Sequence, residues 1–174
     1  MRKVIKILVF GLFLSFAFQA NQAFSQRPIH EIHSMLIYNF IKYVEWPPSS
    51  KSGDFVIAVY GDNAIYNQLN KFYASKPIKG QNVRVKKVDN AGQIGTAHIL
   101  YLADNKSGDF DEVSNKLGSE PTLIITDKNG LGKKGANINF KTISGKLKFE
   151  VNKSAFDKKN LKISNQLVSM AIVI

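Results

Sequence analysis

The chain has 174 residues, no cysteine, and 24 lysines and arginines against 13 aspartates and glutamates, which gives a formal net charge of +11. The absence of cysteine excludes disulfides, lipid attachment through cysteine and every site built on a thiolate. A positive excess of this size is compatible with nucleic acid, anionic lipid headgroups or an acidic protein as partner.

The first 25 residues have the pattern of a signal peptide. Three basic residues lie within the first six positions, an apolar run covers residues 7–18, and Ala23 and Ser25 occupy the small-residue positions of a cleavage site. A retained membrane anchor is the alternative, but a spanning helix needs about 20 apolar residues and this run is shorter. We therefore expect cleavage after Ser25 and an exported protein, for which nucleic acid is not an expected partner.

The remaining residues, 26–174, have the size of a single domain, and no linker divides them. Strands are predicted where β-branched apolar runs lie between glycines, and helices where apolar residues recur every three or four positions. Pro47 ends the first helix because proline disfavours helical geometry at the residue before it. In chain order we expect a helix over 29–45, a strand over 54–62, a helix from Asp62 or Asn63 to Tyr73, strands over 82–88 and 97–103, a helix over 108–117, a strand over 121–127, a hairpin of 136–140 and 146–151, and two short helical segments.

This order of elements predicts an α/β fold. Strand-helix-strand units joined by short loops imply a mostly parallel sheet with helices on both faces. The turn at Ser144-Gly145 predicts that the last two strands form an antiparallel hairpin. The expected architecture is a single three-layer domain, with a mostly parallel sheet, helices on both faces and a C-terminal antiparallel hairpin.

The positive charge is concentrated in the second half of the chain. Ten lysines lie between Lys128 and Lys162, against only Glu150 and Asp157. They alternate with apolar residues, as on the solvent face of a strand, so a soluble lysine-rich surface explains them. An acidic protein partner or anionic lipid is the alternative reading.

Motifs that would carry catalysis or bind a cofactor are incomplete. GLGKKG at 130–135 has the spacing of a dinucleotide fingerprint, but a strand follows it where a helix is required, and it lacks the Ser or Thr of a P-loop. His30, Glu31 and His33 could begin a metal site, although a further ligand is missing nearby. His98 lies in a predicted buried strand, where a hydrogen-bonded core histidine is the commoner role. We expect neither enzyme activity, nor a cofactor, nor a metal.

The first predicted helix is unusually rich in aromatic and apolar residues. One stripe of a 3.6-residue repeat contains His33, Leu36 and Phe40, whereas Tyr38 and Tyr43 fall largely outside it. Either the helix is sandwiched between the sheet and another helix, or the second group forms a protein-binding surface, where aromatic residues are enriched.

Several segments resemble one known family in their order and spacing, from about residue 30 to the last residue. They are Y-N-F-I-K-Y-V-E-W-P at 38–47, the strand ending in Gly61-Asp62, H-I-L-Y at 98–101, T-L-I-I-T-D at 122–127, I-N-F at 138–140, and F-E-V-N at 149–152 followed by a hydrophobic end. Together they resemble the YfiR family of periplasmic regulators.

The resemblance implies a periplasmic α/β protein without catalysis or cofactor. Its expected partner is the periplasmic segment of an inner-membrane signalling protein, either a diguanylate cyclase or a sensor kinase, which it would restrain. The resemblance further implies relief by an outer-membrane lipoprotein, control of cyclic di-GMP and biofilm, and self-association into a homodimer. The expected partner-binding residues are Tyr38, Tyr43, Trp46, Leu167, Met170 and Ile172.

A small-molecule binding module is the alternative function. Open parallel sheets bind ligands beyond the carboxyl ends of their strands. Four residues are expected there, and their carboxylates could hold a cationic or hydroxyl-rich ligand, although loop aspartates are also common turn formers. They are Gly61, Asp62, Asp104 and Asp127.

Overall fold

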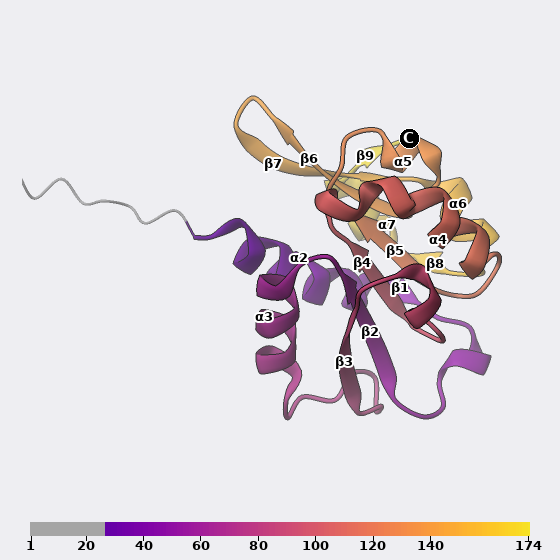
Figure 1. Cartoon of the computed structure of the whole chain (residues 1–174). Helices are drawn as coiled ribbons and strands as arrows, with labels where there is room; N and C mark the ends of the chain where they lie inside the picture. The colour runs from indigo at the N-terminus through magenta and orange to yellow at the C-terminus, as the bar shows by residue number, and fades with distance from the viewer. Residues whose placement is uncertain (1–26) are drawn as a thin grey trace, which may run out of the picture.

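Seven strands form one sheet in the order β3-β2-β4-β5-β6-β7-β9 (Figure 1). The computed structural model describes residues 27–174, so the signal peptide predicted over residues 1–25 lies outside the described residues. Neighbouring strands are parallel except in the β6–β7 hairpin. The strands are β2 (Phe55–Tyr60), β3 (Val83–Val88), β4 (Ile99–Leu102), β5 (Leu123–Thr126), β6 (Ile138–Ile143), β7 (Lys146–Val151) and β9 (Ile172–Val173).

Helices cover both faces of this sheet. One hydrophobic core joins the sheet to α2, α3, α6 and α7, and a second core joins its other face to α4 and α5. This arrangement confirms the predicted α/β fold with a mostly parallel sheet and a C-terminal antiparallel hairpin. No helix within residues 27–174 combines the length and apolar character needed to cross a bilayer. The helices are α2 (Ile29–Tyr43), α3 (Asn63–Tyr73), α4 (Phe110–Leu117), α5 (Leu131–Lys134), α6 (Lys153–Lys158) and α7 (Asn165–Met170), with 3-10 turns at Pro48–Ser50, Ala91–Gln93 and Asp104–Asp109.

The first helix ends two residues earlier than the sequence predicted. β1 (Val44–Glu45) pairs antiparallel with β8 (Lys162–Ile163) in a separate two-stranded sheet. The backbone N–H of Ser164 donates to the carbonyl of Tyr43 at 2.9 Å, which extends this pairing. The small sheet therefore ties the end of α2 to the segment that enters α7.

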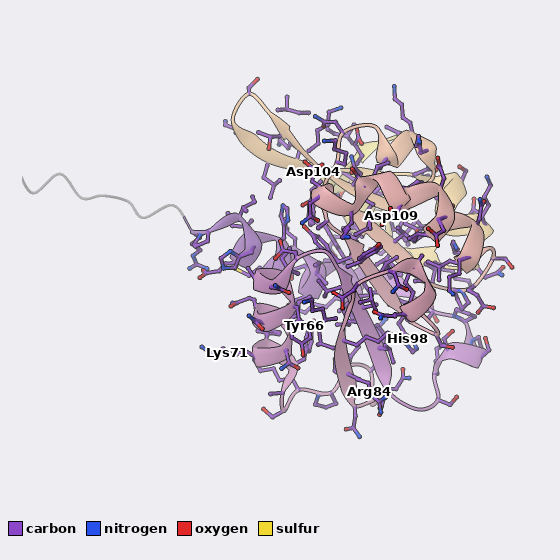
Figure 2. The ribbon with its side chains drawn as sticks, in the orientation of Figure 1. Tyr66, Lys71, Arg84, His98, Asp104 and Asp109 are labelled. Carbon is purple, nitrogen blue, oxygen red and sulfur yellow. The ribbon has the colours of Figure 1, made fainter. Side chains whose placement is uncertain are left out.

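The direction of the chain across the sheet reverses at β2. The chain passes from β2 through α3 to β3 on one side, and then returns to place β4 on the other side of β2. Such a reversal opens a crevice at the carboxyl ends of the strands. Figure 2 shows Asp104 and His98 at opposite ends of β4, with Asp104 at the carboxyl end.

A polar network within the β6–β7 hairpin lies against the GLGKKG segment. Asn139 Nδ2 donates to Glu150 Oε2 at 2.9 Å, and Lys141 Nζ lies 3.0 Å from Glu150 Oε1. Burial alone would raise the pKa of Glu150, but these two hydrogen bonds and the positive charges of Lys141 and Lys133 together outweigh it and lower the pKa. A Cβ atom on Gly132 would lie 2.8 Å from Glu150 Oε2 and 2.9 Å from Ile174 Cδ1. Glycine at this position thus lets α5 pack closely onto the sheet.

Candidate functional site

Residues 164–174 form a well-anchored segment that is largely uncovered. Ser164 Oγ caps α7 by accepting a hydrogen bond from the Leu167 backbone N–H at 3.2 Å. β9 then pairs with β7, and the backbone N–H of Ile174 donates to the carbonyl of Val151 at 3.0 Å. The whole segment contains no charged side chain. Its exposed apolar side chains, which we call the C-terminal surface, are Met170, Ile172, Val173 and Ile174.

The C-terminal surface lies at an open edge of the sheet. β9 is the last strand in the order, and no further strand pairs with its outer edge within residues 27–174. The opposite edge strand, β3, carries Arg84, Lys86 and Lys87, and charges of this kind discourage pairing with another chain. Because β9 has no such charges, this edge is the more open of the two to a partner.

Two of the residues predicted to contact a partner are buried. Leu167 is 1% exposed and belongs to the core beneath α7. Trp46 is 3% exposed, its Nε1 donates to the carbonyl of His98 at 3.2 Å, and its ring meets Phe55 edge-on. A buried indole requires such a hydrogen-bond acceptor, so this environment suits a core residue. We correct the assignment accordingly: both residues support the surface from below and are not accessible to a partner in this conformation.

The aromatic residues of α2 are largely accounted for by packing within the molecule. Tyr38 and Phe72 of α3 meet edge-on, with ring centroids 5.1 Å apart. The ammonium groups of Lys42 and Lys76 each lie 4.2 Å from the centre of one ring, over Tyr38 and Phe72 respectively. Tyr43 is half-buried at the end of the helix. We call Met35, Tyr38 and Phe72 the N-terminal surface, of which Met35 and Phe72 are exposed and Tyr38 is half-buried.

The four residues predicted to bind a ligand follow three neighbouring strands at the same edge of the sheet. The first two have structural roles there. Gly61 has a φ of +94°, and a Cβ atom on it would lie 2.5 Å from Asn105 Oδ1. Asp62 caps α3, because its Oδ1 accepts a hydrogen bond from the Ile65 backbone N–H at 2.9 Å.

Asp104 and Asp127 differ in how well their carboxylates are satisfied. Asp104 forms an ion pair with Lys128 at 2.8 Å, and both side chains are about half exposed. Asp127 is more buried, and its Oδ1 has no hydrogen-bond partner. Burial raises the pKa of Asp127, and the hydrogen bond from Tyr101 lowers it by less. Asp127 is therefore the carboxylate at this edge with unused hydrogen-bonding capacity.

A buried row of three side chains contains Asp127. Tyr101 Oη donates to Asp127 Oδ2 at 2.7 Å and lies 3.0 Å from His33 Nδ1. Because the tyrosine proton is used on Asp127, we assign the His33 proton to Nδ1, which leaves Nε2 as a buried acceptor without a partner. Burial lowers the pKa of His33 to about 4, so the ring is neutral at pH 7. The Phe140 ring stacks on it at 4.0 Å.

The row borders a small cavity at the carboxyl ends of the strands. The cavity has a volume of about 320 Å³, and its lining includes His33, Asp104, Asp127 and Lys128. Sequence reasoning found the aspartates but not His33 or Tyr101 as their neighbours. The sequence analysis had assigned His33 to the apolar stripe of the first helix and to a possible metal motif. The one signal that could have pointed to Tyr101 is its position in a buried strand that leads into an acidic loop.

Other sequence motifs have structural partners. His98 is a hydrogen-bonded core histidine, since its Nδ1 accepts from the Val56 backbone N–H and its Nε2 lies 2.7 Å from the carbonyl of Ser50. In the part of the chain that the structure describes, no group of three or more His, Asp or Glu side chains is arranged to hold a metal ion.

Comparison with known proteins gives one sequence match and several structural ones. The YfiR/HmsC-like family matches residues 30–172. No curated protein matches the chain. Two similar solved structures are an ABC domain in complex with L-Trp from Streptococcus pneumoniae (TM-score 0.54) and a conserved domain protein from Vibrio cholerae O1 biovar El Tor (TM-score 0.51). Each is 14% identical and covers 83% of this chain, which spans only 60% and 59% of theirs, so the likeness concerns the fold.

Proposed function

The chain belongs to the YfiR/HmsC-like family, and from this premise we propose that it is a non-catalytic periplasmic regulator that binds and restrains a membrane signalling protein. The restrained protein would present its periplasmic sensor segment to this chain and carry a diguanylate cyclase or kinase domain in the cytoplasm. Control of cyclic di-GMP, and through it of biofilm, would follow in the first case. Relief by an outer-membrane lipoprotein belongs to the same proposal.

The C-terminal surface is the observation that carries this proposal. It combines exposed apolar side chains, a segment without charged side chains and an open sheet edge, and interface cores are depleted of charged residues in the same way. We assign Met170 and Ile172 to the centre of the contact. Tyr38 and Tyr43 are half-buried, and we assign them to a secondary surface that serves self-association.

Restraint by a binding protein has a simple thermodynamic requirement. The regulator must bind the inactive state of the signalling protein more tightly than its active state, because equal affinity for both states shifts nothing. A counter-partner such as a lipoprotein would then act by competing for the same surface. The lysines between residues 128 and 162 would add attraction if the membrane partner is acidic.

The direct test is recovery of the partner. We would use the tagged protein, folded and without its signal peptide, to capture proteins from detergent-solubilised membranes of its own host, and identify them by mass spectrometry. The expected result is a membrane protein with a periplasmic sensor segment and a cytoplasmic cyclase or kinase domain. Recovery of no such protein by the abundant folded chain would contradict the proposal.

A second candidate function is binding of a small molecule at the carboxyl ends of the strands. The unpartnered Nε2 of His33 and Oδ1 of Asp127 favour it, because buried polar atoms normally have hydrogen-bond partners. Together they could receive hydrogen bonds from a hydroxyl or an ammonium group. A ligand of this class should raise the melting temperature saturably, and Asp127→Asn should abolish the rise. Asp157→Asn, at an exposed position of α6 that does not line this cavity, is the matched control.

A further inference from the structure

A cavity lined by lysines lies where the small β1–β8 sheet meets the end of α2. Its volume is about 530 Å³, which is within the range of small-molecule sites. Four lysines from four different segments line it, and Glu45 is the single acidic residue of its lining. The lysines are Lys42 of α2, Lys51 after the Pro48–Ser50 turn, Lys79 and Lys162 of β8.

The turn that carries Lys79 is firmly anchored. Ile78 and Gln81 form an isolated antiparallel bridge, and Lys79 and Gly80 between them both have positive φ, at 50° and 85°. This is the backbone of a tight hairpin turn, in which a lysine is an uncommon choice. The side-chain Nε2 of the buried Gln81 holds the turn in place, because the carbonyls of Ser50, Ser52 and Gly53 lie 3.2 to 3.3 Å from it and share its two N–H donors. The Lys79 side chain is therefore held at the cavity by the fold around it.

The ammonium of Lys79 has unused hydrogen-bonding capacity. It donates to the carbonyl of Val44 at 2.5 Å and lies 5.4 Å from the centre of the Trp46 ring. An ammonium has three N–H donors, and the carbonyl accounts for one of them. Burial lowers the pKa of Lys79, and the more distant carboxylate of Glu45 compensates only in part. An anion in the cavity would supply the missing acceptor and charge.

The one carboxylate of the lining is already shared. Glu45 Oε1 lies 3.5 Å from Lys51 Nζ, and Glu45 stands directly opposite Lys162 in the β1–β8 pairing. One negative charge thus serves several lysines. A solubilising surface would be expected to spread lysines over its convex parts. Here Lys51, Lys79 and Lys162 line one hollow instead, whereas the ammonium of Lys42 lies over the Tyr38 ring.

We propose that this cavity is a binding site for a small multivalent anion of the phosphate class. Lysine binds phosphate groups as a compact point charge with several donors. Two or three ammonium groups around one hollow suit an anion with more than one negative charge. This site shares no lining residue with the carboxyl-end cavity and none with the C-terminal surface, and the inference does not depend on the proposed function.

Trp46 provides a built-in reporter, because it lines this cavity and is the single tryptophan of the 174 residues. We would titrate the purified protein with inorganic pyrophosphate and follow tryptophan fluorescence at constant ionic strength. The expected result is a saturable change that sodium chloride of equal ionic strength does not produce. A change that is absent, or that chloride reproduces, would overturn the proposal.

Matched lysine variants locate the site. Lys162→Gln changes an exposed residue of the lining, so the fold should survive, and the affinity for pyrophosphate should fall about tenfold, as expected for loss of one charged hydrogen bond. Lys79→Gln should reduce the affinity at least as much, with thermal unfolding checked in parallel. Lys146→Gln, an exposed lysine of the β6–β7 hairpin, is the control and should bind as the unmodified protein does. An equal loss of pyrophosphate affinity in Lys146→Gln would mean that the overall positive charge alone attracts the anion, and it would overturn the proposal.

Discussion

The N-terminal surface and the C-terminal surface differ in how far other side chains of the protein cover them. At the N-terminal surface, the rings of Tyr38 and Phe72 pack against each other, and Lys42 and Lys76 cover them. At the C-terminal surface, no charged side chain occurs anywhere in residues 164–174. The comparison shows that exposed aromatic residues alone do not identify an interface. The first surface is largely satisfied by the chain itself, and the second is the stronger candidate for a partner.

The largest expected effect is a difference in stability between substitutions on the buried face of α7 and on its exposed face. Leu167→Ala should reduce the free energy of unfolding by about 2 to 5 kcal/mol, because it empties a fully buried position between α7 and the core. Met170→Ala, in the same helix but 51% exposed, should change it by no more than about 0.5 kcal/mol. Urea denaturation measures both. A similar loss in the two variants would mean that the C-terminal surface is also part of the core.

A pH-dependent effect of intermediate size should come from the inner side of α2. His33 has a folded pKa of about 4, below its usual value of 6.5. Its neutral form stabilises the fold above pH 6.5, and this contribution is lost as pH falls towards 4, because the unfolded state then binds a proton that the folded state does not. Between pH 8 and pH 5 the loss should be about 2 kcal/mol.

His33→Gln tests this contribution, because glutamine does not titrate. The variant should lose less stability than the unmodified protein over the same pH interval, measured by urea denaturation at each pH. Asp127 cannot mimic the effect, since its raised pKa acts in the opposite direction. Parallel losses in both proteins would show that His33 is not a buried neutral side chain.

A smaller effect should distinguish packing from binding at the N-terminal surface. Tyr38→Ala removes a half-buried ring that contacts Phe72 and Lys42, and should cost about 1 to 2 kcal/mol of stability. Tyr38→Phe keeps the ring and should be nearly neutral. Capture of the membrane partner should be unchanged in both variants once they are folded. If a variant no longer captured the partner but kept its stability, α2 would belong to the primary partner-binding surface, which would contradict this account.

The main elements could be predicted because their signals are local. Runs such as residues 54–62 and 121–127 are apolar enough to be read as buried strands, and Ser144-Gly145 specifies the hairpin turn. The pairing of β1 with β8 could not be predicted, since it joins two-residue strands that are far apart in the chain. The family resemblance led us to expect Trp46 and Leu167 on the partner-binding surface, although both are buried in the core.

The site was predicted in part. The aspartates at the carboxyl ends follow from the parallel sheet, because such ends meet at one edge. The contact of Asp127 with Tyr101, and of Tyr101 with His33, depends on the strand order and on where α2 crosses the sheet. Local sequence periodicity predicts neither the strand order nor the position of α2. The open edge at β9 could not be predicted either, because a two-residue strand is too short to show a periodic pattern.

The central claim, that the C-terminal surface binds a membrane signalling protein, is tested most directly by one matched pair of variants. Ile172→Lys and Ile143→Lys introduce the same charge at isoleucines that are 36% and 40% exposed, the first in β9 and the second near the hairpin turn. The measurement is the amount of partner captured from solubilised membranes, by quantitative mass spectrometry. The account predicts loss of capture for Ile172→Lys and retention for Ile143→Lys. Equal capture by the two folded variants would contradict it.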